Sequence, residues 1–438
     1  MEKVLNPLKK YNMPEKLVIK SIDNKKLVIS PETGNWLLLN NDTQSHIFEM
    51  LVGGMTVGEV LNSLNQEDKP DFIRVLTELE AKQFENTAVQ YPPEHGMYFY
   101  LTNRCNQRCR HCYMLAGQPA DNELKTEEVK SLLQMFAAHG GTMVTFTGGE
   151  ATTRSDFAEI VRYAKERMLK VCVLSNGLLW SQELVNQTKS YVDEIQISID
   201  GFDRESYQSV RGTDSFEDAL AAVVRLTEAG VRVAVAVSPL TDNLLSHEED
   251  YITFAKMLLD KYNVLVKFNT ELMEGRFVVP TEEENQKYRQ CAQRIKAACA
   301  PFSEQEGFAL DHSGNTLFNN CGYGGLSIAA NGDVYFCNLI RKCARQGNIR
   351  TDSFDDLLER AEIARRLSDV CNLIPCRDCD LKYLCGGGCR VKHFQKLTER
   401  KIYTNEPDTE FIRNTVCLSE QKEKIYRLMV SANPYFYR

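Results

Sequence analysis

The chain of 438 residues is long enough for two or three domains, and its 43% hydrophobic and 26% charged residues are typical of a soluble globular protein. A net charge of −8 at pH 7 argues against a nucleic-acid-binding or membrane-surface protein. The first residues form no apolar signal segment and no apolar run approaches a membrane span, so we expect a cytoplasmic protein. Fifteen cysteines in such a protein indicate metal ligation rather than disulfide bonds.

The first 90 residues are predicted to form a small unit of their own. Its strand-like apolar runs cover residues 17–20, 26–30 and 36–39. Three amphipathic helices are expected to follow, over residues 43–51, 57–64 and 69–82. The first two begin at residues that cap helices, around Asn41 and at Thr56.

Three strands followed by three helices, with a Pro31-Glu32-Thr33-Gly34 turn and Gly53-Gly54 between two helices, resemble a known module. It is the PqqD-like recognition element of enzymes that modify ribosomally made peptides, a winged helix-turn-helix. The resemblance implies that residues 1–90 bind the leader of a precursor peptide by strand addition at a sheet edge. A DNA-binding winged helix and a structural cap are the alternatives. DNA is disfavoured because the third helix carries as many acidic as basic residues.

A long alternation of strands and helices follows a linker at residues 91–96 and ends near residue 275. The expected strands cover residues 97–101, 143–146, 171–174, 194–199, 231–237 and 264–268. The expected helices cover residues 125–139, 156–168, 183–190, 216–229 and 251–262. Six such repeats predict a parallel sheet, and six are too few to close an eight-stranded barrel. The predicted fold class is therefore α/β, with an open, partial (β/α)6 TIM-like barrel over residues 91–275.

Three cysteines follow the first of these strands, in the run Cys105-Asn106-Gln107-Arg108-Cys109-Arg110-His111-Cys112. Three thiolates holding a four-iron cluster leave one iron open, whereas a structural zinc site takes four closed ligands. The ring of His111 could stack on a flat ligand over that iron. The spacing resembles the signature of the radical S-adenosylmethionine (SAM) enzymes. The alternative is a remnant of a zinc site.

Polar or glycine-rich clusters also follow the next three strands, at residues 147–150, 175–177 and 198–201. The carboxyl ends of parallel strands share one rim, so all four clusters are expected on the same side of the sheet. The radical SAM resemblance implies that Cys105, Cys109 and Cys112 hold the catalytic [4Fe–4S] cluster. It implies SAM contacts from the following residues: His111, Gly148, Gly149, Glu150, Ser175, Asn176, Ser198, Asp200 and Arg211.

The implied roles of these contacts differ. Gly148 and Gly149 would let the ligand approach the backbone closely, and Glu150 would receive the ammonium group of SAM. Ser175 and Asn176 would help to position the ligand, Ser198 and Asp200 would bind the ribose hydroxyls, and Arg211 would pair with the methionine carboxylate. One-electron cleavage of SAM would then give a 5′-deoxyadenosyl radical that removes hydrogen from a substrate. Surface ion pairing for Arg211 and turn capping for Ser198 are the alternatives.

The region from residue 276 to residue 438 is rich in cysteine and resembles the seven-cysteine SPASM domain, which holds two auxiliary [4Fe–4S] clusters. By position, the outer cluster would be held by Cys376, Cys379, Cys385 and Cys417. The inner cluster would be held by Cys321, Cys337 and Cys389. Its fourth iron is either open or closed by Cys343, and we expect it to be open, so that it can bind a substrate cysteine. Two zinc sites are the alternative.

These resemblances together imply an enzyme with three [4Fe–4S] clusters and SAM that cross-links a precursor peptide. A thioether from a cysteine sulfur to a carbon of another residue is the first expectation, and a carbon–carbon bond is the second. An anaerobic sulfatase-maturating (formylglycine-forming) enzyme is the rival. It is disfavoured because Asn338 occupies the position at which such enzymes usually carry an aspartate that acts as a base. An iron–sulfur electron-transfer or scaffold protein is the non-enzyme alternative. The expected partners are the precursor peptide and a reductant such as flavodoxin or ferredoxin.

Overall fold

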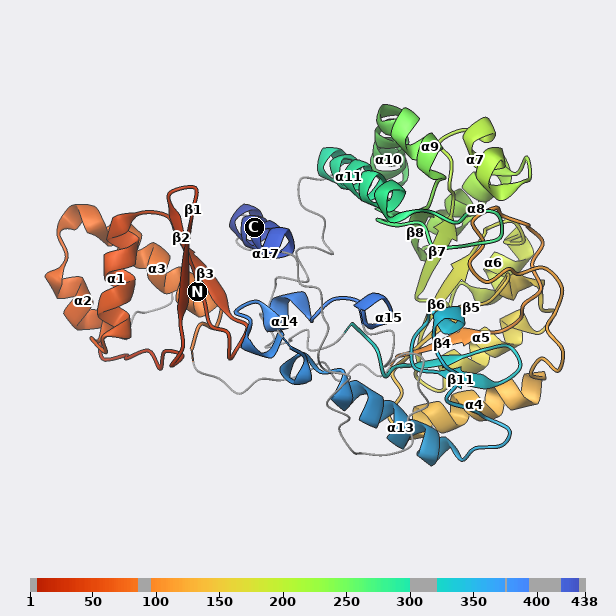
Figure 1. Cartoon of the computed structure of the whole chain (residues 1–438), viewed down its shortest axis with the longest axis horizontal. Helices are drawn as coiled ribbons and strands as arrows, with labels where there is room; N and C mark the ends of the chain where they lie inside the picture. The colour runs from red at the N-terminus through yellow and green to blue at the C-terminus, as the bar shows by residue number, and fades with distance from the viewer. Residues whose placement is uncertain (1–5, 86–95, 300–320, 375, 394–418, 433–438) are drawn as a thin grey trace.

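The computed structural model describes residues 6–85, 96–299, 321–374, 376–393 and 419–432. Within them, an N-terminal unit of strands and helices lies at one end and a large α/β unit at the other (Figure 1). The C-terminal segment, with helices α14 (Lys382–Cys385) and α17 (Ser419–Ala432), lies between them (Figure 1). This arrangement brings the end of the chain back to its beginning.

The N-terminal unit consists of an antiparallel sheet in the order β1-β2-β3, followed by helices. The strands are β1 (Val18–Ile22), β2 (Lys25–Ile29) and β3 (Trp36–Leu39). The helices are α1 (Asp42–Val52), α2 (Val57–Ser63) and α3 (Lys69–Ala81). Asn41 caps α1 and Thr56 caps α2, as their side chains predict, and Glu59 completes a capping box with Thr56. The winged helix-turn-helix likeness stays a prediction.

Both faces of this small sheet are covered. Val28 and Leu37 point into a core shared with helices α1 to α3. Leu27, Trp36 and Leu38 point the other way and pack against side chains of the C-terminal segment. The partners there are Leu381, Leu384, Tyr426 and Met429. The N-terminal unit therefore shares part of its core with the cysteine-rich region.

The central sheet contains six parallel strands in chain order, as the repeats predict. They are β4 (Gly96–Tyr100), β5 (Met143–Thr147), β6 (Lys170–Ser175), β7 (Glu194–Ser198), β8 (Arg232–Val237) and β9 (Leu265–Phe268). The helices between and after them are α4 (Thr126–Ala138), α5 (Phe157–Glu166), α6 (Gln182–Thr188), α7 (Arg204–Arg211), α8 (Phe216–Glu228), α9 (Thr241–Ser246), α10 (Glu248–Tyr262) and α11 (Glu282–Cys299). Their apolar faces form one large core with the sheet.

The C-terminal segment extends this sheet beyond β4, which the sequence analysis did not predict. Strand β10 (Leu326–Ile328) pairs parallel with β4, and β11 (Asp333–Tyr335) and β12 (Gly347–Asn348) add antiparallel strands. The sheet therefore has nine strands, in the order β12-β11-β10-β4-β5-β6-β7-β8-β9. Helices α13 (Phe354–Leu367) and α15 (Arg390–His393) follow. The pairing of β10 with β4 places the cysteine-rich region beside the strand that leads to the three-cysteine loop.

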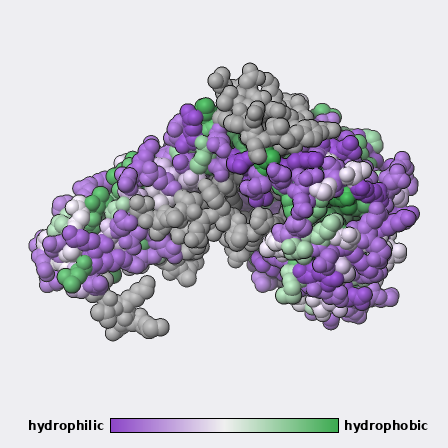
Figure 2. Space-filling view, turned by 90° about the horizontal axis from the view of Figure 1, so that it is seen from below, coloured by the Kyte–Doolittle hydropathy of each residue, from purple (hydrophilic) through white to green (hydrophobic). Residues whose placement is uncertain are grey.

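The surface in Figure 2 is mainly hydrophilic over both the N-terminal unit and the α/β unit, with hydrophobic residues in scattered patches. No helix in the described part of the chain is long and apolar enough to cross a membrane.

Candidate active site

The three-cysteine loop leaves the carboxyl end of β4 and is held down from several sides. The amide of Cys105 donates to the carbonyl of Gly117, and the amide of Arg110 donates to the carbonyl of Val210 in α7. Gln107 is buried and donates to the hydroxyls of Tyr207 and Thr213. Helix α7, which the sequence analysis did not predict, therefore anchors the loop.

In the loop, the thiol residue Cys109 is buried, and Cys105 and Cys112 are half-buried. Burial raises the pKa of Cys105 to about 11 and also raises the pKa of Cys109. Both thiols are therefore protonated at neutral pH in the metal-free chain. Cluster binding must displace these protons, as is general for thiolate ligands.

The structure gives Gly148 and Gly149 a role that the sequence analysis did not predict. A Cβ atom on Gly148 would lie 2.4 Å from the carbonyl oxygen of Thr102, and one on Gly149 would lie 2.3 Å from that of Arg104. The amides of Gly149 and Glu150 donate to these same two carbonyls. The two glycines therefore make room for the start of the cysteine loop and help to fix the loop that carries the thiols. Their contact with SAM stays a prediction.

Glu150, Ser175 and Asn176 meet at the rim, as predicted from their positions after β5 and β6. Glu150 is only 1% exposed. One carboxylate oxygen accepts from the Ser175 hydroxyl at 2.9 Å, and the other accepts from the Asn176 amide at 2.7 Å. The Asn176 side chain donates to Asn106 and contacts the sulfur of Cys105 at 4.0 Å. A buried carboxylate thus lies next to the cysteine loop.

His111, Asp200 and Arg211 form a second buried group. One oxygen of Asp200 lies 2.9 Å from Nε2 of His111 and 2.6 Å from Nε of Arg211. Its other oxygen accepts from the amide of Ser238. Arg211 also donates to the sulfur of Cys109 at 3.7 Å. Burial opposes ionisation of Asp200, but the charges of Arg211 and His111 still hold its pKa below the usual range.

Asp200 and Arg211 face each other in this structure, and their implied contacts with SAM stay predictions. Asp200 is 1% exposed and both of its oxygens face groups of the chain itself, so in this structure it positions His111 and Arg211. Nδ1 of His111 is buried without a hydrogen-bond partner among the described residues, and such an atom is a site for a ligand contact. Ser198, the last residue of β7, is half-buried on the same rim. The residues therefore fit a polar ligand over the cysteine loop.

Three of the four candidate cysteines of the outer cluster lie in the described residues. Cys376 begins a short 3-10 turn, Cys379 accepts from the amide of Leu381, and Cys385 ends α14. Cys417 lies outside the described residues. Cys379 packs against the apolar cluster that the C-terminal segment shares with the N-terminal sheet, and Leu384 of α14 belongs to that cluster. The turn and α14 therefore lie next to the N-terminal sheet.

The predicted ligands of the inner cluster, Cys321, Cys337 and Cys389, all lie in the described residues. The amide of Leu339 donates to the sulfur of Cys337 at 3.4 Å. The amide of Arg390 donates to the sulfur of Cys321, which places Cys321 next to Cys389 in space.

Among the described residues, no three His, Cys, Asp or Glu side chains are arranged as ligands of a single metal ion. A four-iron cube binds each thiolate through a different iron, so its ligands stand further apart than those of one zinc ion.

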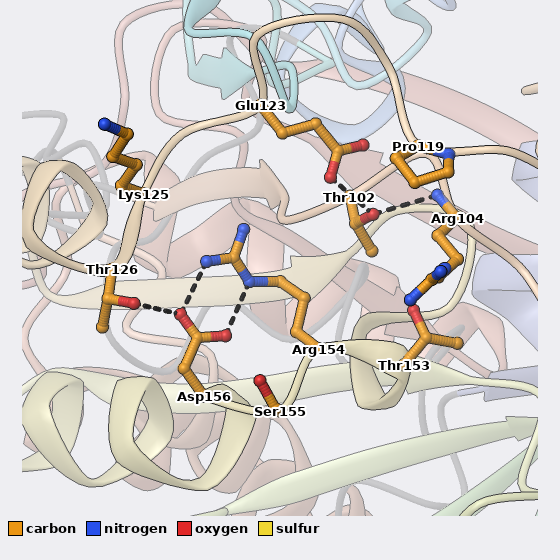
Figure 3. A pocket seen from close by; sticks show the side chains of 10 residues that line it. All are labelled: Thr102, Arg104, Pro119, Glu123, Lys125, Thr126, Thr153, Arg154, Ser155 and Asp156. Carbon is orange, nitrogen blue, oxygen red and sulfur yellow. Dashed lines mark hydrogen bonds and ion pairs between the residues drawn. The ribbon is translucent and has the colours of Figure 1, made fainter.

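A cavity of about 440 Å³ lies beside the cysteine loop but contains none of the predicted SAM contacts (Figure 3). Several of its polar side chains contact one another. Arg154 and Asp156 point toward each other and form an ion pair at 2.6 Å, and Thr102 donates to Glu123 at 2.8 Å (Figure 3). Glu123 also accepts from the amide of Asn103. These contacts support the start of the cysteine loop.

Two family models match the chain. Residues 99–255 match the radical SAM superfamily, and residues 320–380 match the SPASM iron–sulfur cluster-binding domain. The chain thus contains a radical SAM domain followed by a SPASM domain. Such domains imply SAM and iron–sulfur clusters, in agreement with the geometry of the rim.

Similar proteins carry several names. The AdoMet-dependent heme synthase of Oleidesulfovibrio alaskensis is 28% identical over 338 residues, which are 70% of this chain and 86% of that protein. The mycofactocin maturase MftC of Mycolicibacterium smegmatis is 28% identical over 339 residues, which are 74% of this chain and 84% of that protein. The solved structure of anSMEcpe with bound AdoMet and a peptide has a TM-score of 0.54 at 15% identity, covering 77% of this chain and 99% of that one. The last likeness supports the fold.

Proposed function

We propose that this chain is a radical SAM enzyme that binds a ribosomally made precursor peptide and installs a cross-link in it. Three [4Fe–4S] clusters and SAM are its proposed cofactors, and residues 1–90, 91–275 and 276–438 are its proposed peptide-binding, catalytic and auxiliary-cluster regions. A reduced cluster with SAM supplies a carbon radical that takes a hydrogen atom from the substrate.

The chain's own residues have distinct parts in this proposal. Cys105, Cys109 and Cys112 hold the SAM-binding cluster. Glu150 accepts hydrogen bonds from Ser175 and Asn176 at the end of β6, and it receives the ammonium group of SAM. Arg211 is positioned by Asp200 and carries the positive charge that a carboxylate needs.

The observation that carries the peptide assignment is the N-terminal sheet and what it packs against. Among the described residues, β1 and β3 each pair with β2 alone, so each has a free edge. Ile19 on β1 is 50% exposed. A peptide added at such an edge gains backbone hydrogen bonds and a pocket for alternate side chains. Because the sheet shares a core with the cysteine-rich segment, a leader bound there directs the rest of the peptide toward the auxiliary clusters.

Two other functions have specific support. The heme synthase likeness favours a tetrapyrrole, since it covers about as much of the chain as the likeness to MftC. The fold likeness to anSMEcpe raises the sulfatase-maturase alternative. Asn338, however, has no carboxylate that could act as a base, and its carbonyl accepts from Tyr100 at 2.5 Å.

The test uses the reconstituted full-length chain with SAM, a reductant, and synthetic peptides for each short cysteine-containing reading frame found beside its gene. Mass spectrometry should show loss of two hydrogen atoms per cross-link, with one 5′-deoxyadenosine formed per event. If the substrate cysteine then resists iodoacetamide, the bond is a thioether, and if it reacts, the bond joins two carbons. Turnover of an iron tetrapyrrole, with an unchanged peptide, would instead favour the heme synthase likeness.

A further inference from the structure

The cysteine loop carries three exposed arginines, Arg104, Arg108 and Arg110, and residues 101–120 contain no Asp or Glu. Within the described residues, none of these three guanidinium groups forms an ion pair with a carboxylate. The whole chain has a net charge of −8, so this positive charge is a local feature of the loop and not a consequence of composition.

Contacts of the loop bring two of these arginines and a fourth one together near Gly117. The backbone of Arg104 pairs with that of Gly117. The guanidinium of Arg108 lies over the same glycine, because a Cβ atom there would be 3.1 Å from its Cζ atom. Arg276, which follows β9, donates from its guanidinium to the carbonyl of Ala116. The positive charges therefore form one patch and are not scattered over the surface.

Exposed apolar side chains border this patch. The amide of Phe277 donates to the carbonyl of Arg110 at 2.8 Å, and the Phe277 side chain is 69% exposed. Leu115 is 42% exposed and has a φ of 53°, a left-handed conformation that is strained for a bulky residue. Such strain is concentrated at functional sites, and exposed aromatic and arginine side chains are enriched in protein–protein contacts. We call Arg104, Arg108, Arg110, Leu115 and Phe277 the loop surface.

The loop surface lies directly outside the predicted ligands of the SAM cluster. Cys109 is buried, whereas Arg108 and Arg110 on either side of it are exposed. The loop thus turns this thiol toward the interior and the two guanidinium groups toward solvent. A protein bound to the loop surface would be separated from the cluster by the loop alone.

We propose that the loop surface is the docking site of an acidic protein that carries single electrons and reduces the SAM cluster. The carrier loses one electron, and the [4Fe–4S] cluster gains it before SAM is cleaved. The arginines attract the acidic partner over a distance, and Phe277 and Leu115 supply the apolar contact. This inference rests on the proposed radical SAM chemistry and does not depend on the substrate.

The experiment compares three reconstituted full-length chains, in which the loop variant and the control variant each lose three positive charges. The loop variant carries Arg104→Gln, Arg108→Gln and Arg110→Gln. The control carries substitutions of exposed arginines on α3, on α5 and at the amino end of β8, namely Arg74→Gln, Arg162→Gln and Arg232→Gln. The third chain is the parent, and Phe277→Ser is tested separately.

The probe is a purified flavodoxin, an acidic flavoprotein that transfers single electrons. Equilibrium binding of its oxidised form is measured first, at several salt concentrations. The rate of 5′-deoxyadenosine formation is then measured without peptide, once with reduced flavodoxin and once with dithionite. Dithionite is a small reductant that needs no docking site, so it reports on the cluster and SAM alone.

The loop variant should bind flavodoxin about tenfold more weakly at low salt, and its flavodoxin-driven rate should fall by a similar factor. The difference from the parent should shrink as salt is added, because ions screen exposed charges. Phe277→Ser should weaken binding at every salt concentration. The iron content and the dithionite-driven rate should equal those of the parent, and the control should match the parent in every measurement.

Unchanged flavodoxin binding in the loop variant would overturn the proposal, as would an equal loss of binding in the control. Weaker binding of a precursor peptide, with flavodoxin binding unchanged, would assign the loop surface to the substrate instead. A dithionite-driven rate that falls as far as the flavodoxin-driven rate would assign the arginines to the cluster itself. A parent chain that cleaves no SAM with dithionite would contradict the proposed function, while the binding measurement would still decide the docking site.

Discussion

The two cysteine sites of this chain are built in opposite ways. The SAM-cluster loop takes its three thiols from residues 105–112, directly after one strand. The predicted inner auxiliary set takes its thiols from the distant positions 321, 337 and 389, and a hydrogen bond from the amide of Arg390 to the sulfur of Cys321 joins two of these segments. A site made within one loop can be recognised from spacing. A site made by tertiary contacts needs the fold before its members can be identified.

The largest expected effect comes from removing the local site. Replacing Cys105, Cys109 and Cys112 together with alanine should abolish SAM cleavage and lower the iron content from about twelve to about eight. Iron assay and the yield of 5′-deoxyadenosine measure the two results. If the auxiliary irons also disappeared, the two sites would depend on each other for assembly and the contrast between them would fail.

The dispersed site should be sensitive to a residue that binds no metal. Arg390 is fully buried and donates to the carbonyls of Ser368, Gly386 and Gly388, just after Cys389. Arg390→Met leaves these carbonyls without their donor, and it should cost about 1–3 kcal/mol of unfolding free energy for each carbonyl that stays unsatisfied.

Iron assay of Arg390→Met should show loss of auxiliary irons while the SAM cluster remains. Gln107→Leu is the matched control, because it removes two hydrogen bonds from the cysteine loop. It should cost only about 1–3 kcal/mol and keep all the irons, since the loop keeps its backbone anchors. Equal iron loss in both variants would contradict a difference between local and dispersed assembly.

A smaller effect is expected from Glu150→Gln, which keeps the shape of the rim but removes its charge. Hydrogen bonds to charged groups contribute about 1.5–3 kcal/mol, so SAM affinity should fall about tenfold to a hundredfold. Equilibrium binding of SAM to the reconstituted chain measures it, and the iron content should not change. Unaltered affinity would mean that Glu150 serves only to hold Ser175 and Asn176.

The sequence predicted most of what is repeated or local. The six parallel strands, the capped helices and the meeting of Glu150 with Ser175 and Asn176 follow from periodicity and from the common rim of strand ends. Helix α7 was missed because its apolar positions are few. It nevertheless carries Arg211 and anchors the cysteine loop, and its Asp203 cap with Ser206 was the signal that could have found it.

What the sequence could not give are contacts between distant segments. Spacing did not indicate that Gly148 and Gly149 pack against the backbone of residues 102–104. Likewise, no pattern indicates that β10 pairs with β4, or that Trp36 packs near Leu384.

The smallest expected effect concerns the contact between helix α4 and the C-terminal segment. Glu128, on α4, forms an ion pair with Arg350 of the C-terminal segment at 2.6 Å, and Arg350 also donates to the carbonyl of Asn122 behind the cysteine loop. Hydrogen bonds from Arg350 lower the pKa of Glu128 to about 2. Because the folded pKa lies below the unfolded value of 4.5, the stabilisation is complete above pH 4.5 and disappears as the pH falls toward 2.

Glu128→Gln should therefore lower the unfolding free energy at neutral pH by less than about 1 kcal/mol, as is typical of half-exposed pairs. Urea unfolding at a series of pH values should show the difference from the parent chain shrinking below pH 4.5. Glu127→Gln is the matched control, because its 84% exposed side chain pairs only within α4, with Lys130. If the two variants had the same pH dependence, Glu128 would act as an ordinary surface charge. The α/β unit and the C-terminal segment would then be held together by the pairing of β10 with β4 and not by this ion pair.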